Sequence, residues 1–306
     1  MSTNVLVFGA TGAVGSATAI EAHNRGAHVH LALRDTSKPL HKLSASDEKA
    51  GNYTRIAADL SDASSVTAAV KQSSATAAFV YTMHMAPDAM ASTFAALKDA
   101  GVTYVVLLSS FSVAEPASAT DMSSFIPGVH ARAEMALQDS GLDAAMLRPA
   151  YFASNLFAYA QGVKKGRVEV FVPKAVFDYV VPGDIGRVAG GLLVERKARG
   201  GLYLHGPQLR PVREAVGVLG RVVGREVEVE EIGEEAFKKS MGHLPGVVVD
   251  SLTVSLKAMQ DKPVEVFWSG HEEAVENIRR FGGAKPTTLE EWAEEVKGAF
   301  GGTSEG

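Results

Sequence analysis

The chain of 306 residues is long enough for one large domain or for a core domain with a smaller second lobe. Its formal net charge of −5 provides no basic surface for nucleic acid, and the absence of cysteine excludes disulfides and thiolate chemistry. There is no basic and apolar leader of the secretory kind and no apolar run of the roughly 18–20 residues that span a membrane. We therefore expect a cytoplasmic protein that binds neither nucleic acid nor membrane.

The first half of the chain alternates short apolar runs with segments of helical periodicity. The apolar runs predict strands at Val5–Phe8, Val29–Leu33, Tyr53–Ala58, Phe79–Tyr81, Tyr104–Leu108 and Ala144–Leu147. Strands that alternate with helices are typical of a mainly parallel sheet covered on both faces. This half therefore predicts an α/β fold with a Rossmann-type, doubly wound parallel sheet.

The pattern changes after Pro149, where the predicted strands become shorter and more scattered. These strands are expected at Val168–Val172, Phe177–Val181, Leu202–His205 and Val227–Ile232. Helices are expected at Phe237–Met241, Val247–Met259 and His271–Arg280, and a last helix follows a capping box of Thr288 and Glu291. We expect residues 1–150 to form the Rossmann domain. Residues 151–306 should form mainly a smaller α+β lobe, with some segments returning to the Rossmann core.

A glycine-rich loop follows the first predicted strand, with Gly9, Gly12 and Gly15 in a GxxGxxG spacing. Glycine at these positions permits a sharp turn, a close backbone approach to a pyrophosphate, and tight packing of helix on sheet. The helix that follows offers free N–H groups and the positive end of its dipole to the anion. The alternative is a glycine-rich turn without a ligand. The expected dinucleotide contacts are Gly9, Thr11, Gly12, Ala13, Val14 and Gly15.

The end of the second strand distinguishes the two nicotinamide cofactors. An acidic residue there accepts from the ribose 2′-hydroxyl of NAD, whereas this chain has Arg34, whose guanidinium suits a 2′-phosphate. Lys38 adds a second cation nearby. We therefore predict NADP(H). The alternative is that Asp35 contacts the ribose and Arg34 is a solvated turn residue.

Further cofactor contacts are expected where the other strands end, because ligands bind at the carboxyl edge of such sheets. Asp59 and Leu60 follow the third strand, and Asp59 has the alternative of capping a helix that starts at Ser61. The remaining candidates have the alternative of simply ending their strands; they are Tyr81, Thr82, Ser109 and Ser110.

Taken together, these residues resemble the NmrA-like, atypical short-chain dehydrogenase/reductase family, in its quinone and triphenylmethane reductase branch. The resemblance covers the whole chain and rests on the GATGAVG loop, Arg34, Leu108–Phe111, His130–x3–Glu134, Leu147–Pro149, Asn155–Leu156, Val181–Ile185 and Lys285–Trp292. It implies a Rossmann domain that binds NADP(H), a smaller C-terminal substrate lobe, and a substrate cleft between them. The family also includes regulators without catalytic activity that sense the NADP(H) ratio.

The catalytic pair of typical short-chain dehydrogenases is a Tyr-x-x-x-Lys on the helix after strand five. If Glu134 marks the helix register, Ile126 stands at the tyrosine position and His130 at the lysine position. Isoleucine transfers no proton, so the usual dyad is absent. His130 could hold the cofactor, or donate a proton because histidine titrates near physiological pH. The alternative is a packed or surface histidine.

The segment after the sixth strand is expected to meet the nicotinamide and the substrate. Pro149, Tyr151 and Phe152 are predicted cofactor contacts, and Tyr151 is also a candidate catalytic donor. Predicted substrate contacts are Met83, His84, Phe111, Tyr151 and Asn155. The alternative is that the aromatic side chains are core and Asn155 caps a helix. No metal site is expected, because the histidines form no HxH or HExxH motif apart from the His28/His30 strand pair.

The favoured function is an NADPH-dependent reductase of a small conjugated substrate, such as a quinone, imine or enone. Hydride transfer to such acceptors needs no protein acid, since the cofactor performs the hard step. One alternative is a redox-sensing NADP(H) regulator of a partner protein. Another is a natural-product pathway enzyme that runs non-redox chemistry on the same fold.

Overall fold

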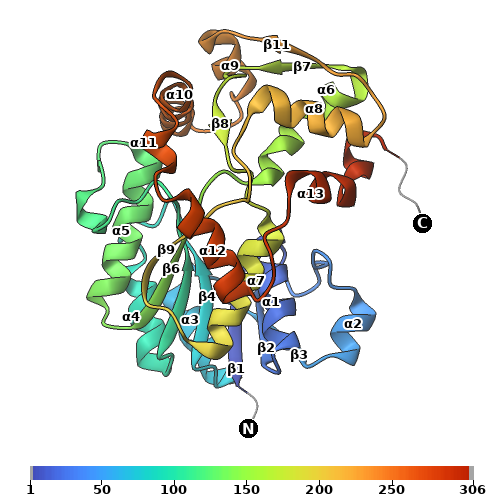
Figure 1. The fold of residues 1–306 in the computed structure, drawn as a ribbon. Coiled ribbons are helices and arrows are strands. Elements are labelled where there is room, and N and C mark those ends of the chain that lie inside the picture. Colours follow the sequence, from blue (N-terminus) through green and yellow to red (C-terminus); the bar gives the residue numbers. More distant parts are fainter. Residues whose placement is uncertain (1–2, 303–306) are drawn as a thin grey trace. The chain divides into compact units, whose positions relative to one another are not determined.

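A computed structural model describes residues 3–302, which divide into two compact units (Figure 1). The first unit comprises Met1–Pro149, Pro182–Leu204 and Glu276–Lys285. The second comprises Ala150–Val181, His205–Val275 and Pro286–Gly306. The assignment of cofactor binding to one part and substrate binding to the other stays a prediction.

A parallel sheet of seven strands forms the centre of the first unit (Figure 1). Its order is β3 (Tyr53–Ala57), β2 (His28–Leu33), β1 (Asn4–Phe8), β4 (Ala77–Tyr81), β5 (Tyr104–Leu108), β6 (Asp143–Pro149) and β9 (Gly200–Leu204). The chain winds outward in both directions from the β1–β4 junction, the switch point at which doubly wound folds bind ligands. The predicted Rossmann-type fold is confirmed, and β9 adds to this sheet a strand that the sequence placed among those after Pro149.

Helices cover both faces of this sheet. They are α1 (Ala13–Asn24), α2 (Ala45–Ala50), α3 (Ala63–Ser73), α4 (Ala91–Ala100), the short 3-10 helix η1 (Ala117–Ala119), α5 (Phe125–Asp139) and α7 (Pro182–Glu195). Side chains of α3, α4 and α5, such as Val66, Phe94 and Leu137, join Leu6 and Val105 of the sheet in one core cluster. Alternate residues of each strand supply that face and the remaining residues supply the other covered face, which explains why Val5–Phe8 of β1 and all of β5 are apolar.

The second unit contains short strands and helices. Its strands pair as β8 (Val176–Phe177) with β10 (Arg210–Pro211), antiparallel, and β7 (Arg167–Val170) with β11 (Glu228–Glu231), parallel. Its helical segments are η2 (Ala153–Tyr159), α6 (Ala160–Lys165), α8 (Val212–Val222), α9 (Glu234–Ser240), α10 (Gly246–Asp261), α11 (Glu265–Trp268), α13 (Leu289–Glu295) and η3 (Lys297–Phe300). The helix α12 (His271–Gly282) runs from the second unit into the first.

Two local sequence signals are confirmed by these elements. Thr288 and Glu291 form the predicted capping box at the start of α13. His28 and His30 lie on one face of β2, as their spacing of two residues predicts, and their rings stack with centroids 4.3 Å apart. In the described part of the chain, no helix is both long and apolar enough to cross a membrane.

Two glycines let α7 approach α1 very closely within the first unit. A Cβ on Gly186 would lie 2.4 Å from the Cβ of Ala17, and one on Gly190 would lie 2.6 Å from the Cβ of Glu21. Their spacing of four residues places them on one face of α7, so the two backbones meet along a groove that no larger residue would fit. This contact fixes the helix that follows the glycine-rich loop.

We expect Gly190→Ala to destabilise the protein by about 1–3 kcal/mol, because the added methyl group overpacks the α1–α7 contact. Urea unfolding followed by circular dichroism measures the change. Gly217→Ala in α8 is the matched control, since its Cβ would meet only the tip of Arg221 at 3.5 Å. Equal stability of the two variants would contradict this account of the groove.

Candidate functional site

The glycine-rich loop has the geometry that its spacing predicts. Gly9 adopts a φ of +73°, and the Gly12 N–H donates to the Gly9 carbonyl at 2.9 Å. A Cβ on Gly15 would lie 2.2 Å from the Gly9 oxygen, so only glycine permits this approach of α1 to the end of β1. Gly12 caps α1 without a side chain, and Thr11 and Gly12 are exposed, so the N–H groups at this end of the helix are open to an anion. These residues fit a dinucleotide pyrophosphate.

A recess beside this loop gathers many of the predicted cofactor residues. Among those that line it are Gly9, Thr11, Arg34, Lys38, Leu60 and Tyr81. Asp35 also borders the recess, but its carboxylate accepts the Ser37 N–H at 2.9 Å and the Ser37 hydroxyl at 2.6 Å. These bonds lower the pKa of Asp35 and engage the carboxylate in its own turn. The exposed Arg34 is therefore better placed than Asp35 to bind a 2′-phosphate.

Asp59 does not cap the helix after β3. The cap of α3 is Asp62, which accepts from the Ser64 N–H, so the alternative reading of Asp59 as the cap is wrong. Asp59 instead accepts from the N–H and hydroxyl of Ser61, and these bonds lower its pKa. Arg34 lowers that pKa further, which indicates that the two residues lie near each other.

The polar residues that end β4 and β5 use their hydroxyl groups inside the fold. Thr82 donates to the Leu108 carbonyl at 3.1 Å, and Ser109 donates to Glu134 Oε1 at 2.5 Å. The hydroxyls of Ser110 and Ser112 lie 2.9 Å apart. Thr82 and Ser109 therefore follow the ends of their strands and form hydrogen bonds within the fold, in agreement with the alternative that they only end the strands. Contact of either residue with the cofactor stays a prediction.

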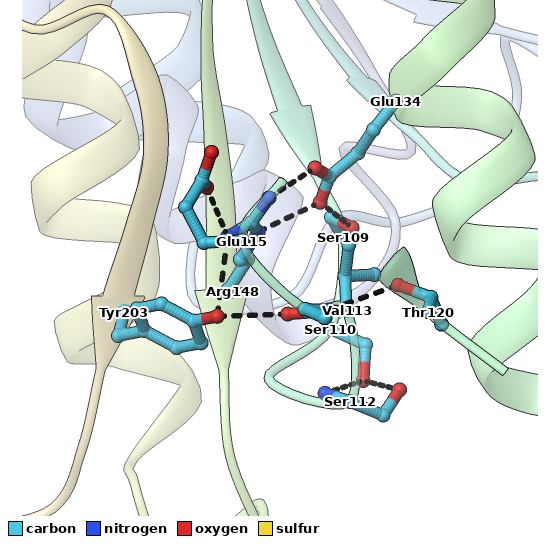
Figure 2. Close-up of polar contacts among 10 residues, drawn as sticks. Ser109, Ser110, Ser112, Val113, Glu115, Thr120, Glu134, Arg148 and Tyr203 are labelled. Carbon is cyan, nitrogen blue, oxygen red and sulfur yellow. Dashed lines mark hydrogen bonds and ion pairs between the residues drawn. The ribbon is translucent and has the colours of Figure 1, made fainter. Parts of the chain in front are cut away.

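A buried ion pair lies at the end of β6. Arg148 and Glu134 are joined by Nη2–Oε2 and Nε–Oε1 contacts of 2.7 and 3.1 Å, and their side chains are 1% and 0% exposed (Figure 2). Arg148 also donates to Glu115 at 2.8 Å and to the Tyr203 hydroxyl at 3.2 Å, and Tyr203 donates to the Val113 carbonyl (Figure 2). Burial alone would lower the pKa of Arg148, but the bonds to Glu134 hold it above its usual value.

The sequence named Glu134 and Arg148 only as positions of a family pattern, without a role. Arg148 interrupts an apolar strand, and a charge in such a run needs a buried partner. The need for a buried partner could have predicted a polar network around Arg148, but it does not say which residues form that network. Together, these residues hold the loop between β5 and α5, which carries Ser110 and Phe111.

Ile126 and His130 lie on α5, four residues apart, as the helix register predicts. His130 is 9% exposed, its Nδ1 has no hydrogen-bond partner within the described residues, and its ring meets that of His84 edge to face at 5.2 Å. Burial first, and the neighbouring His84 second, lower the pKa of His130 to about 3. His130 is therefore neutral near pH 7, and the expectation that it titrates near physiological pH is wrong.

The other predicted site residues of the first unit lie in the loops after β4, β5 and β6. Met83 is half-buried against the core, and His84 is exposed. The Phe111 N–H donates to the carbonyl of the buried Pro149 at 3.0 Å. Within residues 3–302, no group of three or more histidine, aspartate or glutamate side chains could hold a metal ion.

The second unit contains a cavity of about 860 Å³ that is partly open to solvent. Tyr151 and Asn155 both line it, and a side-chain hydrogen bond joins them. Tyr151 stacks on Phe177 with ring centroids 4.0 Å apart. Phe152 lies outside the lining and forms a bridge with Val180. The sequence thus predicted two wall residues of this cavity and missed the others, which come from η2, α6, β7, β8, α8, α9, α10 and the loops beside them.

The carboxylate of Asp178 holds the backbone near this cavity. It is 1% exposed and accepts from the N–H groups of Tyr151 and Gly206, each at 2.8 Å. Burial raises its pKa to about 7, against the opposing effect of the two backbone bonds. A Cβ on Gly206 would lie 2.0 Å from the Asp178 carbonyl oxygen, so glycine is required there. No pattern in the sequence indicates this role of Asp178.

The sheet order and the glycine-rich loop define a doubly wound protein with a Rossmann-type dinucleotide fold. A family model described as the NmrA-like family matches residues 1–293. The chain belongs to this family, which confirms the resemblance seen in its sequence.

Individual relatives agree with this assignment. A nitrogen metabolite regulation-like protein, bik4, of Gibberella fujikuroi is 35% identical over 95% of this chain and 96% of its own length. A (4-alkanoyl-5-oxo-2,5-dihydrofuran-3-yl)methyl phosphate reductase of Streptomyces griseus is 29% identical over 67% of this chain and 70% of its own. The NADPH complex of the quinone oxidoreductase QOR2 of Escherichia coli shares the fold, with a TM-score of 0.74, 20% identity, and coverage of 95% and 99%.

We expect Glu134→Gln to lower the free energy of unfolding by about 3–5 kcal/mol, because Arg148 would lose its buried countercharge and keep only the exposed carboxylate of Glu115. Glu230→Gln is the control: it removes the partner of Arg167 from an exposed pair, where solvent screens the charges. Chemical unfolding of both variants compares them. A Glu134→Gln variant as stable as the control would show that the buried pair contributes little.

Asp178 should make stability depend on pH in a defined direction. Its pKa rises from an ordinary value near 4 in the unfolded chain to about 7 in the fold, so its contribution to stability is full below pH 4 and is lost as pH rises to 7. The stability cost of Asp178→Asn should therefore shrink between pH 5 and pH 8, which unfolding at both values measures. A cost that grows over this range would contradict the raised pKa.

Proposed function

We propose that this protein is an NADPH-dependent reductase of a small conjugated substrate. The observation that carries the proposal is the recess beside the glycine-rich loop, where Arg34 and Lys38 stand beside the exposed N-terminus of α1. Backbone N–H groups there suit the pyrophosphate, and the two cations suit a 2′-phosphate. In this proposal, the first unit binds the cofactor and the second unit binds the substrate.

NADPH, when bound, supplies a hydride, and the residues of this chain orient it and exclude water. His130 is neutral and buried, so it would hold the nicotinamide ribose by a hydrogen bond, and it has no proton to donate as an imidazolium ion. Ile126 offers no acid either. This combination disfavours the interconversion of alcohols and ketones, which needs a proton donor at the reacting oxygen.

Quinones, imines and enones fit these limits, since the reduced anion of such a substrate can take its proton from water. Tyr151 would donate a hydrogen bond to the substrate oxygen, because burial raises the pKa of its hydroxyl and keeps it protonated. Asn155 would orient the same oxygen through its bond to Tyr151. The names of QOR2 and of the Streptomyces griseus reductase, whose substrate is an unsaturated oxo-dihydrofuran, support this class of acceptor.

A second candidate is a regulator that binds NADP(H) without turnover and signals its redox state to a partner protein. The name of the Gibberella fujikuroi relative, and the isoleucine at the position of the usual catalytic tyrosine, favour it. A regulator should bind NADPH and NADP⁺ with different affinities, and its partner should bind only one of the two states. Steady NADPH oxidation with a quinone or an enone would favour the reductase.

We expect Arg34→Ala to weaken NADPH binding by about 10–100-fold, as the loss of a charge-assisted contact does, and to leave NADH binding within twofold. Calorimetric titration with both cofactors measures this. Asp35→Ala is the matched control and should change neither affinity by much, since its carboxylate is engaged with Ser37. Equal losses for NADPH and NADH in Arg34→Ala would refute the 2′-phosphate assignment.

A further inference from the structure

Two separate pairs of stacked aromatic rings line the cavity of the second unit. Tyr151 and Phe177 form one pair, with centroids 4.0 Å apart and planes at 26°. Phe171 and Phe237 form the other, at 4.6 Å and 8°. The first pair comes from the start of the unit and from β8, and the second from the end of β7 and from α9. The cavity therefore offers two aromatic surfaces on different elements.

The surroundings of the two pairs differ in polarity. Asn155 hydrogen-bonds to Tyr151, so the first pair carries a polar group that can face a ligand oxygen. The second pair is joined in the lining by apolar side chains of neighbouring elements, namely Ile232, Met241, Leu252 and Leu256. Ser240 also lines the cavity, but its hydroxyl donates to the Phe237 carbonyl at 2.7 Å.

Charged residues add little that would hold a ligand here. Arg167 borders the cavity, but it pairs with Glu230 at 2.9 Å and is exposed. Lys165 and Glu169 also border it, with opposite charges. Most of the lining is therefore aromatic or aliphatic, and this favours a ligand held mainly by buried apolar area.

The volume of about 860 Å³ is near the upper end of the roughly 300–1,000 Å³ of drug-sized ligand pockets. A ligand of one ring fills only a small part of this volume and leaves the rest of the cavity to water. Building on the proposed function, we infer that the substrate is a carbonyl compound of several fused rings. Its reacting oxygen lies at Tyr151 and Asn155, and its far rings lie against Phe171 and Phe237.

The test compares 1,4-benzoquinone, 1,4-naphthoquinone and 1,4-anthraquinone, which carry the same quinone ring and add fused rings on its far side. Binding is measured by calorimetry on the full-length protein saturated with NADP⁺, so no turnover occurs. The absence of cysteine removes the thiols that quinones alkylate. We expect affinity to rise about tenfold or more with each added ring, as apolar groups that fill a pocket do. Equal affinities for all three would overturn the inference.

Variants separate the two aromatic pairs. Phe237→Ala should remove most of the advantage of anthraquinone and leave benzoquinone affinity within twofold, whereas Tyr151→Phe should weaken all three quinones alike. Leu256→Ala, a milder change in α10, should follow Phe237→Ala in direction, and this keeps the test decisive if Phe237→Ala fails to fold. If Phe237→Ala or Leu256→Ala weakens benzoquinone as much as anthraquinone, the inference fails.

This outcome is distinct from that of the proposed function. Tight, size-dependent binding without any NADPH oxidation would refute the proposed reductase function and still support the inferred ligand class. Equal affinities for benzoquinone and anthraquinone, together with equally efficient NADPH oxidation by both, would refute the inferred ligand class and support the proposed reductase.

Discussion

Arg148 has to be neutralised where it lies, because its side chain is 1% exposed and a buried cation without a partner costs several kcal/mol. Glu134 from α5 meets this demand, and the same carboxylate accepts from Ser109 at the end of β5. One interaction thus fixes the position of α5 relative to two neighbouring strands. His130 and Ile126 lie on that helix, and Phe111 lies in the loop that the network holds, so the placement of all three depends on this ion pair.

The parts of the fold that the sequence predicted are those set by local rules. Glycine at positions 9 and 15 reflects backbone and packing demands within a few residues, and the structure shows both: a positive φ at Gly9 and a Cβ clash at Gly15. The partners of Arg148 lie 33 and 55 residues away at Glu115 and Tyr203, and no local pattern encodes such distances. The strand expected at Leu202–His205 was placed with the lobe for the same reason: only the sheet itself shows that β9 pairs with β6.

The candidate site was predictable to different degrees in its two parts. Arg34, Lys38 and Tyr81, which line the recess, could be predicted from their positions after strands, because parallel strands place their carboxyl ends at one edge of the sheet. The cavity walls were mostly missed, since α9 and α10 carry apolar residues that any helix would bury. His130 was found from its spacing, but its protonation state depends on burial and on His84, which lies 46 residues earlier in the chain.

The hydrogen bonds of Asp178 have a consequence for how the second unit unfolds. The chain enters this unit at Ala150, His205 and Pro286. Asp178 bonds to the second residue of the first two of these segments, Tyr151 and Gly206, and itself lies three residues before the exit at Val181. Three segments that are distant in sequence therefore share one carboxylate. None of them can open alone without leaving a buried acceptor or donor unsatisfied, so these segments should open as one cooperative unit, whose hydrogen exchange would be set by a single opening step.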